Sequence, residues 1–460
     1  MNASASRFSL PLITALAGTA LAQVPDGYAV FGAFGGGATG QGIYFCHPRD
    51  TTAPPIAVAN LPQNLSSAGS GSRGVASLLR RPSDGALIVG ERAPANASVD
   101  VHVLHLTGNA VTFAQLFSCG TSVTFGEIPQ MGLLPDGRVV VGASDLKQGS
   151  QLAHFFNGGA FNWQGLSTLD TKSGQWQTIA VTNWSAFAGV INGLAVSRDG
   201  NTVYIGAWIS SSSGALWAVP VVGGTATMVA AMPFGASNVT IDQDDTVLVT
   251  ALNGPPNLFR YDPVSTALTP VPSTSGPMNA IAIESATGNY MVCTANAGLP
   301  PRSIVWRTPA GTENVLQVTP TAATLSAIDV NPNPESYGAG TPALASYHWV
   351  TAPNPGGLPE VGNAGFSVTV AASQPMLAQG LFAFSNAAIP PVSALGVNIL
   401  IDPTGASLFL AILIDTATFP IPIPATPSLV STVLFGQSFW FELVAGGGFA
   451  ASPGISFTVL

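Results

Sequence analysis

Short apolar stretches joined by tight turns recur along most of the chain. In each repeat an apolar run leads into a turn that contains Asp, Gly or Asn, and a second run rich in Val and Ile follows. Runs of this kind predict β-strands, because strands are short and favour β-branched residues. The turn residues tolerate the positive φ angles that a hairpin reversal needs. The pattern therefore predicts β-hairpins at residues 78–90, 131–142, 194–206, 239–250 and 281–293.

A third strand pattern follows several of these hairpins, and a shorter fourth strand then leads into the next repeat. The third strands are predicted at residues 215–219, 258–262 and 304–307. Four antiparallel strands in each repeat form the blade of a β-propeller, whose radial arrangement leaves only short sheet edges. The repeats therefore predict an all-β fold in which the blades form a ring.

The N-terminal strand patterns form a further blade that lacks its innermost strand. These strands are predicted near residues 28–31, 43–46 and 56–59, and residues 325–330 can supply the missing strand. A blade that is shared by both ends of the domain ties the ring together. We therefore predict a six-bladed β-propeller over residues 23–334, with a seven-bladed ring as the alternative.

The repeat stops near residues 335–342, where the composition shifts. Beyond this point, strand patterns are separated by turns rich in Pro, Gly and Ser. They are predicted at residues 366–370, 380–384, 396–401, 408–414, 439–443 and 455–460. Strands at this spacing are typical of a β-sandwich, so residues 335–460 are predicted to form a second, C-terminal β-sandwich domain.

The start of the chain has the pattern of a signal peptide. Arg7 precedes an apolar run at residues 8–21, and Ala20 and Ala22 are small residues of the kind that signal peptidase accepts. The apolar run is too short to span a bilayer as a lasting anchor. We therefore predict a signal peptide at residues 1–22 and a secreted protein that is extracellular, periplasmic or associated with the cell surface.

The composition narrows the classes of partner. Charged residues make up 8% of the chain, and the formal net charge is −9. A phosphate backbone requires clustered Lys and Arg, yet lysine occurs only at Lys147 and Lys172 and the arginines are scattered. Apolar stretches after the leader are interrupted within a strand's length by Pro, Gly or polar residues. We therefore expect neither nucleic acid binding nor a membrane span.

The hairpins, with an Asp-Gly turn and a Val-Tyr-Ile-Gly strand at residues 203–206, resemble those of the lactonase-like, NHL-like and YVTN-type propeller families. The resemblance covers residues 24–334, and its motifs are structural. It implies the propeller fold and carries no activity with it.

The C-terminal domain has a resemblance of its own. The boundary at residues 337–342, the Pro-rich run at 419–424 and the final strand at 455–460 look like the C-terminal module of secreted proteins from planctomycete-type bacteria. That module often follows a propeller. The resemblance carries no role with it, and the leading functional hypothesis treats the sandwich as an accessory or attachment module.

Two sequence motifs that resemble functional sites are interpreted as structural. The glycines within residues 35–40 fit the spacing of a dinucleotide-binding loop, but a strand pattern rather than a helix follows them. His102 and His105 lie three residues apart in a strand, so we expect them on opposite faces and without a shared metal.

The three cysteines, Cys46, Cys119 and Cys293, are too few and too far apart for a disulfide framework. Cys293 stands where other repeats have Gly or Thr, which favours a small buried side chain. We expect all three to be buried apolar residues, with a single disulfide as the alternative.

Polar residues at the strand ends form the candidate site, because these ends meet around the central channel of a propeller. The residues that follow the second strands are Glu91, Asp145, Asn253 and Asn296, and those that begin the inner strands are Asn192, Ser237, Asn279 and Ser326. Trp184 and Trp208 offer aromatic surface suited to stacking on sugars or peptides.

No catalytic constellation accompanies this set, so the leading prediction is a secreted, non-catalytic propeller that binds an extracellular protein, glycan or envelope partner. The alternative is a metal-dependent hydrolase or lyase. Six-bladed lactonases, which the hairpins resemble, hold a divalent cation at the channel mouth with carboxylate and amide groups. An oxygen-rich ring suits Ca²⁺, so Ca²⁺ is left open as a cofactor.

Overall fold

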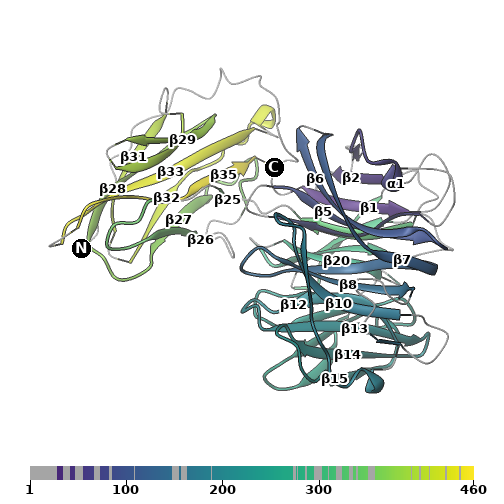
Figure 1. The fold of residues 1–460 in the computed structure, drawn as a ribbon. Coiled ribbons are helices and arrows are strands. Elements are labelled where there is room, and N and C mark those ends of the chain that lie inside the picture. Colours follow the sequence, from purple (N-terminus) through teal and green to yellow (C-terminus); the bar gives the residue numbers. More distant parts are fainter. Residues whose placement is uncertain are drawn as a thin grey trace.

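Figure 1 shows the computed structural model from the side, with the stacked strands of the N-terminal part next to the separate C-terminal part. The sheets of the N-terminal part form a ring that closes between its first and last strands. The structure describes residues 28–34, 42–46, 55–66, 73–81, 85–107, 109–147, 155–156, 163–187, 189–272, 276, 278–284, 287–294, 303–308, 310–317, 324–330, 335–337, 340–350, 358–394, 396–402, 406–413, 415–429, 432–444 and 447–459. The predicted signal peptide lies outside these residues.

The first three blades of the ring are joined into one continuous sheet. From the innermost strand outward, the first blade consists of β24 (Thr324–Val330), β1 (Ala29–Phe34), β2 (Gly42–Cys46) and β3 (Ile56–Ala57). The second consists of β4 (Gly74–Arg80), β5 (Leu87–Pro94), β6 (Ser98–Thr107) and the first half of β7 (Ala110–Leu133). The third consists of the second half of β7, β8 (Val139–Leu146), β10 (Trp163–Asp170) and β11 (Gln175–Thr178), with β9 (Phe155–Phe156) paired to β10.

The other three blades are separate sheets of four consecutive strands. They are β12 (Val190–Val196), β13 (Thr202–Ser210), β14 (Ser213–Pro220) and β15 (Thr227–Met232); β16 (Ala236–Ile241), β17 (Val247–Ala251), β18 (Leu258–Asp262) and β19 (Ala267–Pro270); and β20 (Met278–Glu284), β21 (Asn289–Thr294), β22 (Ser303–Arg307) and β23 (Glu313–Gln317). The helical elements of the ring are α1 (Gln63–Ser66) and a 3-10 turn at Trp184–Ala186, among the residues that the structure describes. The prediction of a six-bladed β-propeller is confirmed.

The two ends of the propeller share its first blade, as the sequence predicts. β24 pairs antiparallel with β1, from Ala29 opposite Val330 to Phe34 opposite Thr324. The innermost strand of this blade therefore comes from the end of the domain, while the outer three come from its beginning. Backbone hydrogen bonds, rather than a covalent link, close the ring.

The hairpin turns explain why the repeats reverse where they do. Asp136 and Asp199 each accept a hydrogen bond at 3.0 Å from the backbone N–H two residues later. The next residues, Gly137 and Gly200, take positive φ angles of 86° and 73°, which glycine adopts without steric cost. In the fifth blade Asp245 holds this position with a φ of 64°. The turn chemistry is therefore shared, although one blade lacks the glycine.

Small residues on the second strands let adjacent blades pack closely. A Cβ atom added at Gly90 or at Gly206 would lie 2.8 Å from Ile128 or Val239 of the next blade. Cys293 occupies the same position in the sixth blade and is fully buried. All three cysteines are buried and free, which confirms the interpretation of these residues as core side chains.

The C-terminal part is a β-sandwich. Its larger sheet contains β25 (Glu335–Tyr337), β35 (Gly454–Thr458), β33 (Val433–Glu442), β28 (Ala378–Ser385) and β31 (Ser407–Leu413), with β34 (Phe449–Ala451) paired to β33. The smaller sheet contains β26 (Tyr347–Val350), β27 (Ser367–Ala372) and β32 (Thr416–Pro420), and β29 (Ala388–Ala394) pairs with β30 (Val397–Ile401). A short 3-10 turn at Pro427–Leu429 follows β32.

Aromatic side chains fill the space between the two sheets of the sandwich. The rings of Tyr347 and Trp440 stack at 5.5 Å, and those of Phe382 and Phe419 stack at 4.9 Å. Leu358, between β26 and β27, instead packs into the apolar core between the first two blades of the propeller. This side chain therefore connects the sandwich to the ring. No helix among the described residues is long and apolar enough to cross a membrane.

Candidate functional site

The inner strands of the propeller carry β-bulges near their first residues. The register shifts around Asn192 in β12, Ser237 in β16, Asn279 in β20 and Ser326 in β24. A bulge leaves one residue out of the ladder and bends the strand, which re-aims its side chain. All four residues line one cavity of about 560 Å³ at the mouth of the central channel. The structure thus brings together the residues that the sequence singles out at the starts of inner strands.

The same side chains fasten each blade to the next. Each of them donates a hydrogen bond to a backbone carbonyl in the following inner strand. The bonds run from Asn192 Nδ2 to Ala236 O (2.9 Å), from Asn279 Nδ2 to Leu325 O (2.8 Å), from Ser237 Oγ to Met278 O (2.5 Å) and from Ser326 Oγ to Val75 O. Among the described residues, no donor reaches Oδ1 of Asn192 or of Asn279. Part of the polar lining is therefore structural, and the two amide oxygens remain available as acceptors.

An extra strand pairing builds up the rim on the side of the second and third blades. β7 does not end after the second blade but continues into the third, and on the way its residues Phe125, Gly126 and Glu127 pair with the end of β5. This pairing sets Arg92 directly opposite Glu127. Arg92, Phe125 and Glu127 all line the cavity.

The charged groups of the cavity lie on this side. The guanidinium of Arg92 is 3.6 Å from the Glu127 carboxylate and 5.5 Å from the centre of the Phe125 ring. Burial raises the pKa of Glu127; Arg92 opposes this effect, and the nearby negative charge of Asp145 adds to it. Asp145 Oδ2 accepts hydrogen bonds from the backbone N–H and the hydroxyl of Thr124, at 2.8 and 2.7 Å.

Aromatic surface is available at the same rim. The Phe125 side chain is 49% exposed. Trp208 is half-buried and lies directly against the backbone of Gly235, where a Cβ atom would be 1.9 Å from its ring. One side of the cavity therefore carries aromatic and charged groups, and the opposite side carries the neutral side chains of Ser237, Asn279 and Ser326.

Further along the inner strands, Gln130 crosses the channel. Its Oε1 accepts hydrogen bonds from the backbone N–H groups of Leu194 (2.8 Å) and Val239 (3.0 Å). Its Nε2 donates to Asn238 Oδ1 and to Val239 O, at 2.9 and 2.8 Å. A side chain of the third blade thus ties together the fourth and fifth blades beyond the cavity, which makes it part of the floor rather than of the binding surface.

The other predicted site residues lie elsewhere. Glu91 is fully buried, and Asn253 is not among the residues that line the cavity, although its neighbour Leu252 is. Trp184 packs edge-on against Phe187 at 4.8 Å, in the core of the fourth blade. Asn296 lies outside the described residues. Of the predicted set, the structure therefore places Asp145, Asn192, Trp208, Ser237, Asn279 and Ser326 in the cavity.

Sequence reasoning missed Arg92, Phe125 and Glu127. For Arg92 the signal was only its charge at the end of β5, because both faces of this strand are buried and Ile88 and Gly90 share the face of Arg92. For Phe125 and Glu127 no local signal exists. Their position depends on β7 passing from one blade to the next without a turn.

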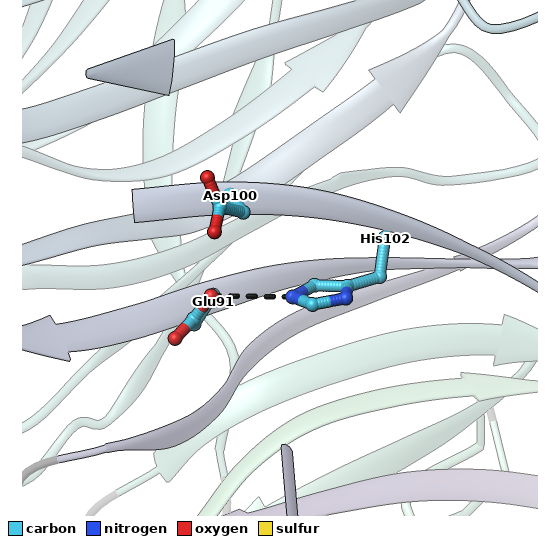
Figure 2. A group of neighbouring side chains, drawn as sticks. All are labelled: Glu91, Asp100 and His102. Atoms are coloured by element: carbon cyan, nitrogen blue, oxygen red, sulfur yellow. Dashed lines mark hydrogen bonds and ion pairs between the residues drawn. The ribbon is translucent and has the colours of Figure 1, made fainter. Parts of the chain in front are cut away.

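A second group of ionisable side chains lies inside the second blade. Among the residues that the structure describes, Glu91, Asp100 and His102 are a set whose potential ligand atoms all lie within 4.8 Å of one another (Figure 2). All three are buried. His105, three residues further along β6, instead packs at 5.7 Å against the ring of Phe113 and is partly exposed. The two histidines therefore do not share a site, as the strand period predicts.

The chain has remote structural similarity to known proteins. No protein-family model matches the chain, and no curated protein matches it in sequence. Solved structures that resemble it include TolB from Acinetobacter baumannii, with 13% identity, a TM-score of 0.45 and coverage of 66% of each chain. A 6-phosphogluconolactonase-like protein from Bacteroides fragilis has 11% identity and a TM-score of 0.41, over 66% of this chain and 98% of that one. A protein of unknown function from Bacteroides thetaiotaomicron has 9% identity and a TM-score of 0.41, over 68% and 79%.

Proposed function

We propose that this protein is a secreted, non-catalytic propeller that binds an extracellular protein, glycan or envelope partner in the channel-mouth cavity, with the sandwich as an accessory or attachment module. The observation that carries the proposal is the rim, where the exposed Phe125 ring lies by Arg92 of the Arg92–Glu127 ion pair and Trp208 lines the same cavity. Aromatic faces stack on sugar rings or on apolar side chains, and the charged pair offers both donors and acceptors.

The size of the cavity favours a small group over a broad protein surface. Its volume of about 560 Å³ falls within the range of small-ligand sites, roughly 300–1,000 Å³. Of the partners considered, a glycan fits this chemistry best, because one or two sugar rings present flat apolar faces together with hydroxyls. The neutral amides and hydroxyls on the far side of the cavity suit those hydroxyls.

The test is binding of purified residues 23–460 to a glycan array and to a fractionated secretome. We expect specific binding by the wild-type protein and a roughly two- to twelvefold loss of affinity in Phe125→Ala and in Trp208→Ala, since stacking contributes roughly 0.5–1.5 kcal/mol for each ring. Phe113→Ala is the matched control, because Phe113 is an exposed phenylalanine of the same strand outside the cavity. Equal binding by all four proteins, or none by the wild type, would refute the proposal.

The second candidate is a metal-dependent, lactonase-like hydrolase or lyase at the same mouth. The unbonded Oδ1 atoms of Asn192 and Asn279, together with the carboxyl groups of Asp145 and Glu127, are oxygen ligands of the kind that Ca²⁺ uses. This function predicts that Ca²⁺ raises the melting temperature.

The Asn192→Ala/Asn279→Ala double variant separates metal binding from stability. It removes two hydrogen bonds between blades, so its melting temperature falls whatever its effect on the metal. The informative quantity is therefore the Ca²⁺-induced shift, which this candidate expects in the wild type and not in the variant. A wild-type melting curve that chelator leaves unchanged would rule the candidate out.

A further inference from the structure

The buried group in the second blade interrupts an otherwise apolar face. Leu87 and Val89 of β5 and Leu104 of β6 belong to the core between the first two blades. Glu91 continues the first series and Asp100 and His102 continue the second, because side chains two residues apart point to the same face of a strand. Glu91, Asp100 and His102 are only 0%, 2% and 1% exposed.

With His102 neutral, the charges of this group do not balance. Arg73 Nε donates to Glu91 Oε1 at 2.5 Å and compensates one carboxylate. Asp100 accepts a hydrogen bond from the Ser98 hydroxyl, and among the described residues no arginine or lysine forms an ion pair with it. Figure 2 shows one oxygen of Asp100 directed toward Glu91. Two carboxylates facing each other in a dry interior call for a positive charge beyond that of Arg73, and either a protonated His102 or a bound cation supplies it.

The ligand atoms suit a small divalent ion. His102 Nε2 lies 3.2 Å from Glu91 Oε2. Two ligands of a tetrahedral zinc ion, with bonds of about 2.0–2.1 Å, are separated by about 3.3 Å, so these two atoms already have the spacing of a ligand pair. Asp100 completes a set of one nitrogen and two oxygen donors within 4.8 Å.

We propose that Glu91, Asp100 and His102 form a buried site for a divalent transition-metal ion of the zinc class. Imidazole with carboxylates suits Zn²⁺ and its neighbours in the first transition row, whereas Ca²⁺ takes six to eight oxygen ligands and no imidazole. The site is separate from the channel-mouth cavity. The two sites are adjacent along β5, because Arg92, which lines the mouth of the cavity, follows Glu91 in this strand.

The ion holds β5 and β6 together at the point where their pairing ends. Gly90 opposite Val101 is the last pair between these strands, and from Arg92 onward β5 pairs with β7 instead. A metal that joins Glu91 to Asp100 and His102 bridges this opening. The proposed metal site does not depend on what the cavity binds. A negative result for the metal site therefore does not contradict the proposed function of the cavity, and the reverse also holds.

The test uses full-length mature protein that has been stripped with chelator and titrated with Zn²⁺, Mn²⁺ or Ca²⁺ by calorimetry and thermal denaturation. We expect one Zn²⁺ per chain and a rise in melting temperature with Zn²⁺, and no effect of Ca²⁺. X-ray absorption of the zinc complex is expected to show nitrogen and oxygen ligands without sulfur, because Cys119 packs in the core cluster on the other face of the blade.

Matched variants assign the site. Asp100→Asn and His102→Gln keep the size of the side chain while weakening the donor set, and both are expected to lower Zn²⁺ affinity at least tenfold. His105→Ala, which removes the exposed histidine of the same strand, is expected to leave the affinity and stoichiometry unchanged. Absence of stoichiometric Zn²⁺ binding by the wild type, or loss of binding in His105→Ala alone, would overturn the proposal whether or not the other variants fold.

Discussion

Single residues in the hairpin turns show how the sequence sets the local backbone. Asp136 and Asp199 cap their turns, and the glycine that follows each takes a positive φ. In the fifth blade the capping residue is Asp244, which accepts hydrogen bonds from the N–H and hydroxyl of Thr246 at 3.1 and 2.6 Å. Asp245 then occupies the glycine position with a φ of 64°. A residue with a Cβ is strained there.

Replacing Asp245 with glycine is therefore expected to stabilise the propeller by about 0.5–1 kcal/mol. The change removes an ion pair between Asp245 and Arg198 at 3.1 Å. Both side chains are exposed, so this pair contributes little to stability. The measurement is the free energy of unfolding from denaturant curves.

The reverse substitution serves as the control. Gly137 has a φ of 86°, and an added Cβ would meet no atom within 4 Å. Gly137→Asp therefore creates no steric clash and is expected to destabilise the protein by a similar amount through the backbone cost. If both variants change stability in the same direction, the positive φ is not the cause.

At the scale of the element, the repeated bulge performs two tasks. In four of the six blades it aims one side chain of the inner strand into the cavity, and that side chain donates to the backbone of the next blade. This part of the lining is therefore hydrogen-bonded to the ring. Phe125 and Arg92 come instead from the pairing of β5 with β7, which belongs to no repeat.

Gln130 is the element-scale contact with the largest expected effect. Gln130→Ala removes the partners of the Leu194 and Val239 N–H groups, and unsatisfied backbone groups cost about 1–3 kcal/mol. We expect a loss of that size in the free energy of unfolding. Gln177→Ala, at an exposed glutamine of β11, is expected to have almost no effect. A tolerated Gln130→Ala would show that the channel floor is held by other contacts.

At the scale of the whole molecule, the closure of the ring contains a titratable group. Asp329 of β24 accepts hydrogen bonds from the backbone N–H groups of Arg80, in the second blade, and of Val330, at 2.7 and 2.9 Å. Burial raises the pKa of Asp329 to about 6, although these hydrogen bonds and the charge of Arg80 oppose the rise. The folded state therefore holds the proton more tightly than the unfolded chain, in which the pKa is about 3.9.

This difference predicts a pH dependence of stability. The stabilisation is complete below about pH 4 and is lost as the pH rises through about 6, because the folded protein must then bury a charge. As the pH rises from 4 to 7, we expect the melting temperature of Asp329→Asn to increase relative to that of the wild type. This relative increase corresponds to about 1–2 kcal/mol in the free energy of unfolding. Solvent reduces the effect of burial, because the Asp329 side chain is partly exposed. Parallel pH profiles for the two proteins would show that Asp329 does not titrate in this range.

Much of the fold could be predicted because its signals are local. Apolar runs and Asp-Gly turns predict the hairpins, since strand formation and turn geometry depend on neighbouring residues. The missing innermost strand of the first blade predicts the closure by β24. The starts of inner strands also locate Asn192, Ser237, Asn279 and Ser326, because every repeat enters its blade at the same end.

Tertiary structure decided which other groups meet. The alternation along β5 places Glu91 on the same face as Leu87 and Val89, but only its register beside β6 brings it to Asp100 and His102. Likewise, Phe125 and Glu127 reach the rim because β7 spans two blades. The sequence by itself determined the strands, the turns and the closed ring. The contacts between strands far apart in the chain decided the cavity and the buried cluster, because they depend on register and on the path of β7, which no local pattern encodes.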